Sequence, residues 1–421
     1  MKTTSLIVTL GAALLLAQAA TTVAQKTWQT VADFQCERFT AVDALTKDAA
    51  GNLYAAVASS DADGRTHAQV RKSSDRGTTW TVVEDLVSAV AGSTKFFSLG
   101  ADTAGHLFAV GHTSDEENQT RWIVRKSSNG GNSWSTVDDF AGPGGQEATA
   151  HAFAADATGN LYVAGFGDES PSEGKSGWRT HWLVRQSRDG GRSWATIDDF
   201  SYSFSARAAA IVSTSHGLFV AGSGWNDKPE SGQRWLVRKG TVDDAGGTRW
   251  QTVDEFQFEE NKNGYDSRPS GLAVDALGNL YVVGRGYVLV DGAIIPHWIV
   301  RRASRAGSDW TVVDTFQLHP GHFAAARGVA ASAQGGVYVV GQAQARDFST
   351  HWIVRKSATG EAGSWSINDD FRPSEISGGL CILSDSKRIF AGGWSSGGLK
   401  HAMVRRVELS RTNDLTVARA H

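Results

Sequence analysis

Residues 273–284 read Ala-Val-Asp-Ala-Leu-Gly-Asn-Leu-Tyr-Val-Val-Gly, with small and apolar residues on both sides of a Gly-Asn turn. This pattern is typical of a tight hairpin between two buried strands. Related stretches occur at 101–111, 154–165 and 330–341. The chain therefore repeats one hairpin, and the repeat decides the fold.

Two further strands follow each hairpin. One resembles His181-Trp182-Leu183-Val184-Arg185, and the next begins at a tryptophan, as in Trp194-Ala195-Thr196-Ile197-Asp198. The tryptophans that open this last strand lie 52 to 60 residues apart, at Trp28, Trp80, Trp134, Trp194, Trp250, Trp310 and Trp365. So long and steady a period predicts a repeat architecture of four-stranded units.

A four-stranded sheet cannot bury both faces alone, whereas sheets arranged radially around an axis cover one another. We therefore predict an all-β protein, a seven-bladed β-propeller of four-stranded antiparallel blades. Residues 26–34 provide only a fourth strand and residues 379–406 only three strands. The N-terminal strand should complete the last blade and close the ring. We place the propeller at residues 25–410 and a C-terminal tail at 411–421.

Residues 1–24 have the features of a secretory signal peptide. Lys2 precedes an apolar run at 6–16, and Thr22-Val23-Ala24 offers small residues for cleavage. The protein is expected to be secreted or periplasmic, with no integral membrane segment after cleavage. A net charge of -3 without a basic stripe argues against a nucleic-acid partner. We expect a monomer.

The chain has two cysteines, Cys36 and Cys381, near opposite ends of the sequence. Either they form a disulfide clasp across the ring closure, which an oxidising compartment permits, or Cys381 is a small buried residue and Cys36 a thiol. Neither belongs to a metal-ligand spacing, so we predict no metal and no cofactor.

The turn Ser73-Ser74-Asp75-Arg76-Gly77-Thr78-Thr79-Trp80 and two copies of it resemble the Asp-box, or bacterial neuraminidase repeat, of the sialidase-like superfamily. The matching positions are Ser73, Asp75, Gly77, Trp80, Ser127, Asn129, Gly131, Trp134, Ser187, Asp189, Gly191 and Trp194. The resemblance implies a propeller in which these residues build turns on the face away from the ligand. Members include hydrolases, lyases, receptors and lectins, so it selects no activity. Sialidase activity is disfavoured, because an Arg-Ile-Pro motif is absent and sialidase propellers have six blades.

Residues shared by all repeats are interpreted as structural. An arginine recurs in the third strand, with an acid in the following strand, which predicts Arg–carboxylate pairs between neighbouring strands. The arginines are Arg71, Arg125, Arg185, Arg238, Arg301, Arg355 and Arg405, and the acids are Glu84, Asp138, Asp198, Asp254, Asp314 and Asp369.

Residues that differ between repeats are the candidates for binding. Charged side chains stand just before the innermost strands and should ring the channel mouth, with Tyr265 in a loop on the same face. The candidates are Lys95, His151, Arg207, Tyr265, Arg268 and Arg327. A cationic funnel would suit a carboxylated or sulfated sugar. The alternative is that the arginines are independent of one another, each paired with a loop acid such as Asp266 or simply solvated.

We expect an exported binding protein that recognises a glycan or a protein partner through its loop face. The alternative is a carbohydrate-active enzyme, a polysaccharide lyase or a glycoside hydrolase, acting on an anionic polysaccharide. A lyase would use a Tyr/His pair with arginines that neutralise a uronate, and a hydrolase would need two facing carboxylates. The sequence leaves catalysis open and favours binding alone.

Overall fold

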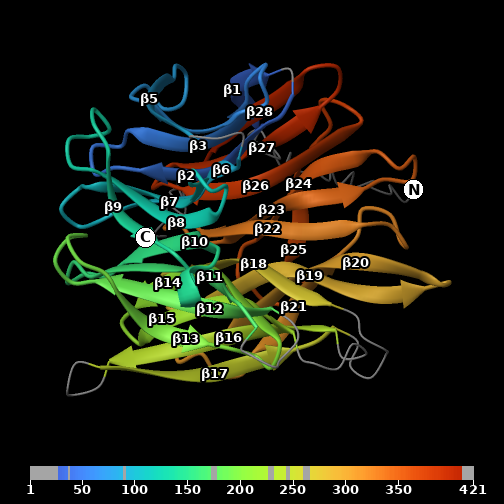
Figure 1. Cartoon of the computed structure of the whole chain (residues 1–421). Coiled ribbons are helices and arrows are strands. Elements are labelled where there is room, and N and C mark those ends of the chain that lie inside the picture. The colour runs from blue at the N-terminus through green and yellow to red at the C-terminus, as the bar shows by residue number, and fades with distance from the viewer. Residues whose placement is uncertain are drawn as a thin grey trace, which may run out of the picture.

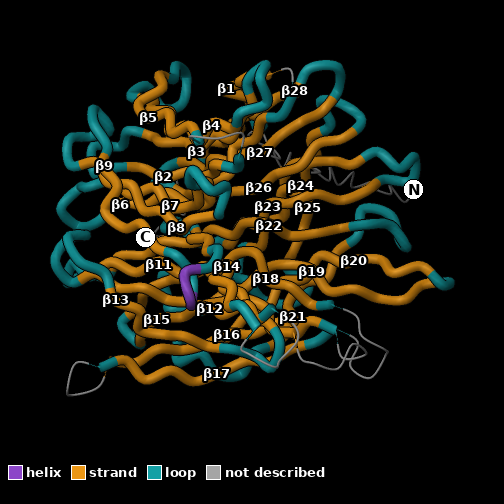
Figure 2. The backbone as a smooth tube through the Cα atoms, in the orientation of Figure 1, coloured by secondary structure: helices purple, strands orange, loops and turns teal. Residues whose placement is uncertain are grey.

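The computed structural model describes residues 27–36, 38–88, 92–171, 178–225, 232–242, 247–258 and 266–409. Within these ranges the chain is all-β, with 28 strands and one 3-10 turn, η1 (Pro143–Gly145), which is the purple segment in Figure 2. No helix among the described residues is long and apolar enough to span a membrane. The strands pair in antiparallel runs of four.

The first strand of each run lies at the centre of the molecule (Figure 1). These strands, called the axial strands below, are β2 (Thr40–Lys47), β6 (Thr94–Ala101), β10 (Ala148–Ala155), β14 (Ser205–Thr214), β18 (Ser267–Val274), β22 (Ala324–Ala331) and β26 (Ile376–Ser384). Each contacts the next in this order, and β26 contacts β2. The axial strands therefore form a closed ring.

The other strands follow outward from each axial strand. The second strands are β3 (Leu53–Ser60), β7 (Leu107–Ser114), β11 (Leu161–Glu169), β15 (Gly217–Trp225), β19 (Leu280–Val290), β23 (Val337–Gln344) and β27 (Arg388–Ser396). The third strands are β4 (Thr66–Ser73), β8 (Thr120–Ser127), β12 (Arg179–Ser187), β16 (Gln233–Val242), β20 (Ala293–Ala303), β24 (Thr350–Ser357) and β28 (Lys400–Glu408). The fourth strands are β5 (Thr81–Val87), β9 (Ser135–Phe140), β13 (Ala195–Phe200), β17 (Thr248–Phe256), β21 (Thr311–Phe316), β25 (Trp365–Phe371) and β1 (Gln29–Cys36).

The strands group into five sheets, three of four strands and two of eight. A single parallel bridge makes each larger sheet, Thr180 to Ser205 in one and Thr350 to Ile376 in the other. Each run of four is called a set below.

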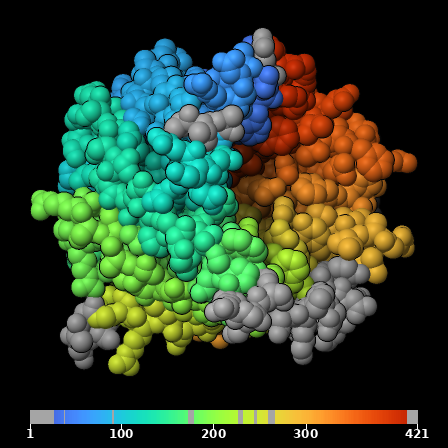
Figure 3. Space-filling view, viewed as in Figure 1, coloured from blue at the N-terminus to red at the C-terminus, as the bar shows by residue number. Residues whose placement is uncertain are grey.

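The N-terminal strand closes the ring, as predicted. β1 pairs antiparallel with β28, from Gln29 opposite Arg406 to Cys36 opposite Lys400. In Figure 3 the colour passes around the molecule in chain order, and the blue N-terminal atoms meet the red C-terminal atoms. Phe390 and Ala402 also pack with Val42 of the first axial strand, so one apolar core spans the junction.

Buried tryptophans fill the spaces between sets. Trp122, Trp182, Trp235, Trp298 and Trp352 are fully buried in the apolar clusters. The ring of Trp122 lies against Gly165 of the next set, where an added Cβ would come within 2.6 Å of the ring and 2.1 Å of the Thr149 carbonyl. Only glycine fits there, which explains why Val-Gly or Ala-Gly recurs in the second strands.

The arginine–carboxylate pairs exist, but they join different partners from those predicted. Six of the seven arginines bond the acid of the preceding set, as in Arg185 to Asp138, with two hydrogen bonds of 2.8 Å. The same pairing links Arg125–Glu84, Arg238–Asp198, Arg301–Asp254, Arg355–Asp314 and Arg405–Asp369. The pairs therefore stabilise the seams between sets.

The Ser-x-Asp turns connect third and fourth strands. In the first copy the Asp75 carboxylate accepts hydrogen bonds from the Ser73 and Thr79 hydroxyls and from the amides of residues 78 and 79. The Gly77 φ of 92° is left-handed, and the Trp80 indole donates to the Gly77 carbonyl. The copies at Ser187–Asp189 and Ser127–Asn129 have the same Ser-to-Asp or Ser-to-Asn bond. These residues build local structure.

The two cysteines do not form a disulfide, so the clasp alternative is wrong. The Cys36 thiol lies 3.1 Å from the Ser60 carbonyl, whereas the Cys381 thiol lies 3.6 Å from the Val42 carbonyl at the axis. Ring closure brings the strands together at β1 and β28, but Cys381 is on an axial strand, two strands further in. Burial raises the pKa of the Cys381 thiol well above its usual range.

Candidate functional site

Every axial strand carries a bulge at the same height. Its pairing with the second strand skips one residue, for example Asp43 between Val42 and Ala44. The skipped residues are Asp43, Phe97, His151, Ala209, Ser270, Arg327 and Leu380. A bulge re-aims the side chain of the extra residue. The same height in the ring thus presents a different side chain from each set.

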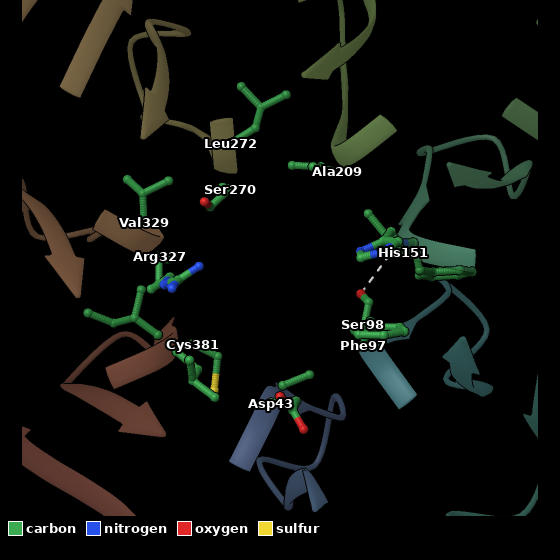
Figure 4. Close-up of a pocket in the computed structure, with 18 of the residues that line it drawn as sticks. Asp43, Phe97, Ser98, His151, Ala209, Ser270, Leu272, Arg327, Val329 and Cys381 are labelled. Carbon is green, nitrogen blue, oxygen red and sulfur yellow. Dashed lines mark hydrogen bonds between the residues drawn. The ribbon is translucent and has the colours of Figure 1, made fainter. Parts of the chain in front are cut away.

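The bulged residues line a central cavity of about 210 Å³. In Figure 4 Asp43, Phe97, His151, Ala209, Ser270 and Arg327 surround an open centre, and Arg327 extends into it. Acid, base, aromatic and aliphatic side chains meet here, and the bulged residue is of a different type in each set. The cavity and its rim form the candidate site.

The predicted cations all lie on axial strands, at two levels. His151 and Arg327 are bulged and line the cavity. Lys95, Arg207 and Arg268 each stand two residues before a bulge, toward the face where the axial strands begin, which is called the mouth below. Tyr265 lies outside the described residues.

Two of the mouth cations are paired with acids, as the alternative interpretation expected. The Lys95 ammonium lies 2.9 Å from the Asp43 carboxylate, and the Arg268 guanidinium bonds Asp266. Burial nevertheless raises the pKa of Asp43, and its second oxygen is buried without a hydrogen-bond partner. Lys95 and Arg268 therefore leave little uncompensated positive charge for a ligand.

The other two arginines have no acidic partner among the described residues. Arg207 is exposed, and its guanidinium lies 4.4 Å from the centre of the Phe166 ring. Arg327 is held by packing, and its Nε is buried without a partner. Burial and the nearby charge of Arg285 lower the pKa of Arg327 to about 10. At neutral pH Arg327 stays charged, and its charge faces the cavity.

Arg285 is a site residue that the sequence interpretation missed. It lies on β19 opposite Arg268, and its Nε is also buried without a partner. Its guanidinium lies 5.6 Å from the centre of the Tyr287 ring. The signal was present in the sequence: Arg285 follows the recurring glycine of the second strand, where other sets have His112, Phe166, Ser223 and Gln342. Aligning the repeats at that glycine would have found it.

Aromatic rings continue the wall from the bulge of β6 to Arg207. Phe97 stacks on His151 with ring centres 4.4 Å apart, and His151 lies 5.5 Å from Phe166. Burial, together with the charges of His112, Lys95 and Arg207, lowers the pKa of His151 to about 4. The His151 imidazole is therefore neutral at physiological pH and can accept a proton or a hydrogen bond.

The described cavity wall contains one carboxylate, Asp43. No group of three His, Cys, Asp or Glu residues in the described ranges could hold a metal ion. The chemistry available on this wall is thus anion binding by arginine, ring stacking, and proton transfer at a neutral imidazole.

The fold is similar to that of solved carbohydrate-active enzymes. An ulvan lyase, bound to linked glucuronic acid and sulfated rhamnose, is 12% identical over 87% of this chain and 95% of its own, with a TM-score of 0.50. An arabinanase of Penicillium chrysogenum, complexed with arabinobiose, is 12% identical over 90% of this chain and 98% of its own, with a TM-score of 0.49. A protein of unknown function from Dyadobacter fermentans is 13% identical over 91% of this chain and 99% of its own, with a TM-score of 0.44.

At these identities the likeness shows the fold alone, which is a β-propeller. No protein-family model matches the sequence, and no curated protein matches it.

Proposed function

We propose that this propeller is a carbohydrate-active protein that binds an anionic polysaccharide at the mouth of its central channel. The observation that carries the proposal is the pair Arg285 and Arg327. These like charges lie close enough for one to lower the pKa of the other, and both have a buried Nε without a partner. An unpaired guanidinium in a partly buried place is costly, and a bound carboxylate or sulfate would remove that cost.

The neighbouring rings suit a saccharide rather than a small inorganic anion. Phe166 lies beneath Arg207, and Phe97 stacks on His151, so aromatic surface adjoins the cations, and the C–H faces of sugar rings pack on such surface. Guanidinium forks bind carboxylates and sulfates in a bidentate manner. An acidic sugar could therefore use both kinds of contact at once.

A uronate lyase is the second candidate. Such an enzyme neutralises the uronate carboxylate, removes the adjacent proton with a base and protonates the leaving oxygen. Arg285 and Arg327 could neutralise the carboxylate, while the neutral His151 imidazole could serve as the base and the Tyr287 hydroxyl as the acid. The ulvan lyase of similar fold supports this candidate over binding alone. A hydrolase is less well supported, because the one carboxylate of the described wall, Asp43, is paired with Lys95.

The finer features of the fold belong to the same proposal. The 28 strands and the closed order of the axial strands support seven blades, and the bonding of the Ser73–Trp80 turn supports an Asp-box propeller. Export to the periplasm or the cell exterior rests on residues 1–24, and the tail is placed at 411–421; both segments lie outside the described residues. We also propose a monomer that does not bind nucleic acid.

Calorimetric titration with size-defined oligogalacturonates tests the function. Replacing Arg285 and Arg327 together by Ala should weaken binding at least about 100-fold, since each charged hydrogen bond contributes about 1.5–3 kcal/mol. Arg268→Ala is the matched control, because Arg268 is already paired with Asp266. It should weaken binding less than about tenfold. Undiminished binding by the double variant would refute the proposal.

An ultraviolet assay for unsaturated products on the wild-type protein separates the two candidates. Product formation that His151→Ala abolishes, with oligosaccharide binding retained, would assign a lyase. Binding without product would assign a binding protein.

A further inference from the structure

Two exposed tryptophans lie on the mouth face beside Arg207. The structure describes all 15 tryptophans of the chain, and only Trp178 and Trp225 are exposed, by 55% and 40%. Phe204 is 42% exposed, and its ring packs edge-on against Trp225 with centres 6.4 Å apart. Exposed apolar side chains that gather on one face of a protein often mark a binding surface.

The strand register brings these rings together from two sets. Ser205 pairs with Trp225 across β14 and β15, and it forms the parallel bridge to Thr180 of β12. Trp178 precedes Thr180 by two residues, and Phe204 directly precedes Ser205. The three strands are neighbours in Figure 1. The cluster therefore lies across the seam between the β10–β13 and β14–β17 sets.

The same register connects the cluster to the channel. Residues two apart on a strand, and residues directly opposite across a pair, share one sheet face. Trp225, Ser205 and Arg207 accordingly share a face, and Arg207 lies over Phe166, whose ring neighbours His151 at the cavity. Aromatic and cationic side chains thus follow one another from the cavity wall to the outer rim.

We propose that Trp178, Phe204 and Trp225 form a stacking platform for further sugar rings of the same anionic polysaccharide. This inference rests on the proposed function and deepens it: the protein would bind an extended internal stretch of polymer, with acidic groups at Arg207, Arg285 and Arg327 and sugar faces on the rings. The exposed guanidinium of Arg207 between platform and cavity favours an anionic sugar chain as the occupant. An apolar protein segment would leave Arg207 without a counter-charge.

Titration with oligogalacturonates of increasing length tests the platform. Wild-type protein should bind the octasaccharide more tightly than the disaccharide. A Trp178→Ala/Trp225→Ala variant should lose at least about tenfold in affinity for the octasaccharide and keep its affinity for the disaccharide. Phe348→Ala is the matched control, because Phe348 is 70% exposed and belongs to a different set. It should behave like wild type, and unchanged melting temperatures would show that each variant is folded.

Hydroxyl-radical footprinting gives a direct second readout. Bound octasaccharide should protect Trp178 and Trp225 from oxidation and leave Phe348 unprotected. Wild-type octasaccharide affinity in the double tryptophan variant, or unprotected tryptophans, would overturn the platform. Failure of the wild-type protein to bind any of the oligosaccharides would instead overturn the proposed function, and the platform with it.

Discussion

The seams between sets and the wall of the central cavity follow opposite rules. At the seams one solution recurs, a third-strand arginine bonded to the fourth-strand acid of the preceding set, in six pairs. At the cavity wall the bulged residue differs in every set, from Asp43 to Leu380. The same residues recur at the seams because neighbouring sheets must pack against each other in the same way. The bulged positions escape that constraint because they face open space, and they are therefore available for a ligand.

Breaking one seam pair should have the largest effect on stability. Arg238→Ala leaves the Asp198 carboxylate buried without its cation, which should lower the free energy of unfolding by about 3–5 kcal/mol. Denaturant unfolding of the variant and the wild type measures the difference. A change below about 1 kcal/mol would show that the seam pairs do not stabilise the ring.

Arg71 provides the matched control, because its seam lacks the acid. The register that places Asp198 opposite Val184 places Ala32 opposite Val404, so Arg71 has no carboxylate in the usual place. It bonds Gln69 instead and lies 4.2 Å from the centre of the Phe34 ring. Arg71→Ala should cost only about 1 kcal/mol.

The seam between the last set and the first, where Arg71 lies, should resemble the other seams once the missing acid is supplied. Ala32→Asp puts a carboxylate where Arg71 can bond it, which should raise the free energy of unfolding by about 1 kcal/mol after the cost of burying the acid. Thermal unfolding would report the gain, and an Arg71→Met background should remove it. An equal gain in that background would mean that Arg71 is not the partner.

The turns between third and fourth strands should produce a smaller effect that depends on pH. Hydrogen bonds from Thr79 and Ser193 hold the pKa values of Asp75 and Asp189 well below the usual range. A carboxyl group whose pKa is lowered by folding stabilises the protein at pH values above its ordinary pKa of about 3.9. That stability is lost as the pH falls toward the lowered pKa. Melting temperatures should therefore decline below about pH 4 partly because of these turns.

Replacing both aspartates by Asn should flatten that acid decline. Asn129 occupies the same place in the second turn, where its side chain bonds Ser127 and Ser133, so the turn tolerates the amide. Melting temperatures measured between neutral pH and pH 3 would compare the double variant with wild type. An unchanged acid slope would show that the two carboxylates do not titrate with folding.

Much of the architecture could be predicted from the sequence because each repeat carries the same strand and turn signals. The hairpin at Gly278, the recurring Trp and the incomplete ends predicted the four-strand unit and the closure by β1. The partner of each seam arginine could not be predicted, since Arg125 has an acid available in its own set as well as in the preceding one. Cys36 lies on an outermost strand and Cys381 on an axial strand. Their positions in the sequence do not give their distances from the axis, so whether they meet could not be predicted.

The candidate site was predictable only in part, for a related reason. Charge stands out among small residues, so the sequence could single out Lys95, His151, Arg207, Arg268 and Arg327. It placed them just before the innermost strands, whereas they lie within the axial strands. The sequence did not show which cations lack an acidic partner, because the pairing depends on side-chain packing. Asp43 pairs with Lys95 and Asp266 with Arg268, whereas Arg285 joins Arg327 from another strand.

One paired measurement tests the central claim, that the repeated seams stabilise the ring while the divergent wall binds ligand. Arg238→Ala and Arg327→Ala each remove one arginine, and both variants can be assayed for thermal unfolding and for oligogalacturonate binding. We predict that Arg238→Ala lowers the melting temperature but leaves oligogalacturonate binding unchanged at temperatures where the variant is folded. Arg327→Ala should keep the wild-type melting temperature and lose oligogalacturonate binding. Both properties falling together in either variant, or binding that survives in Arg327→Ala, would contradict this division.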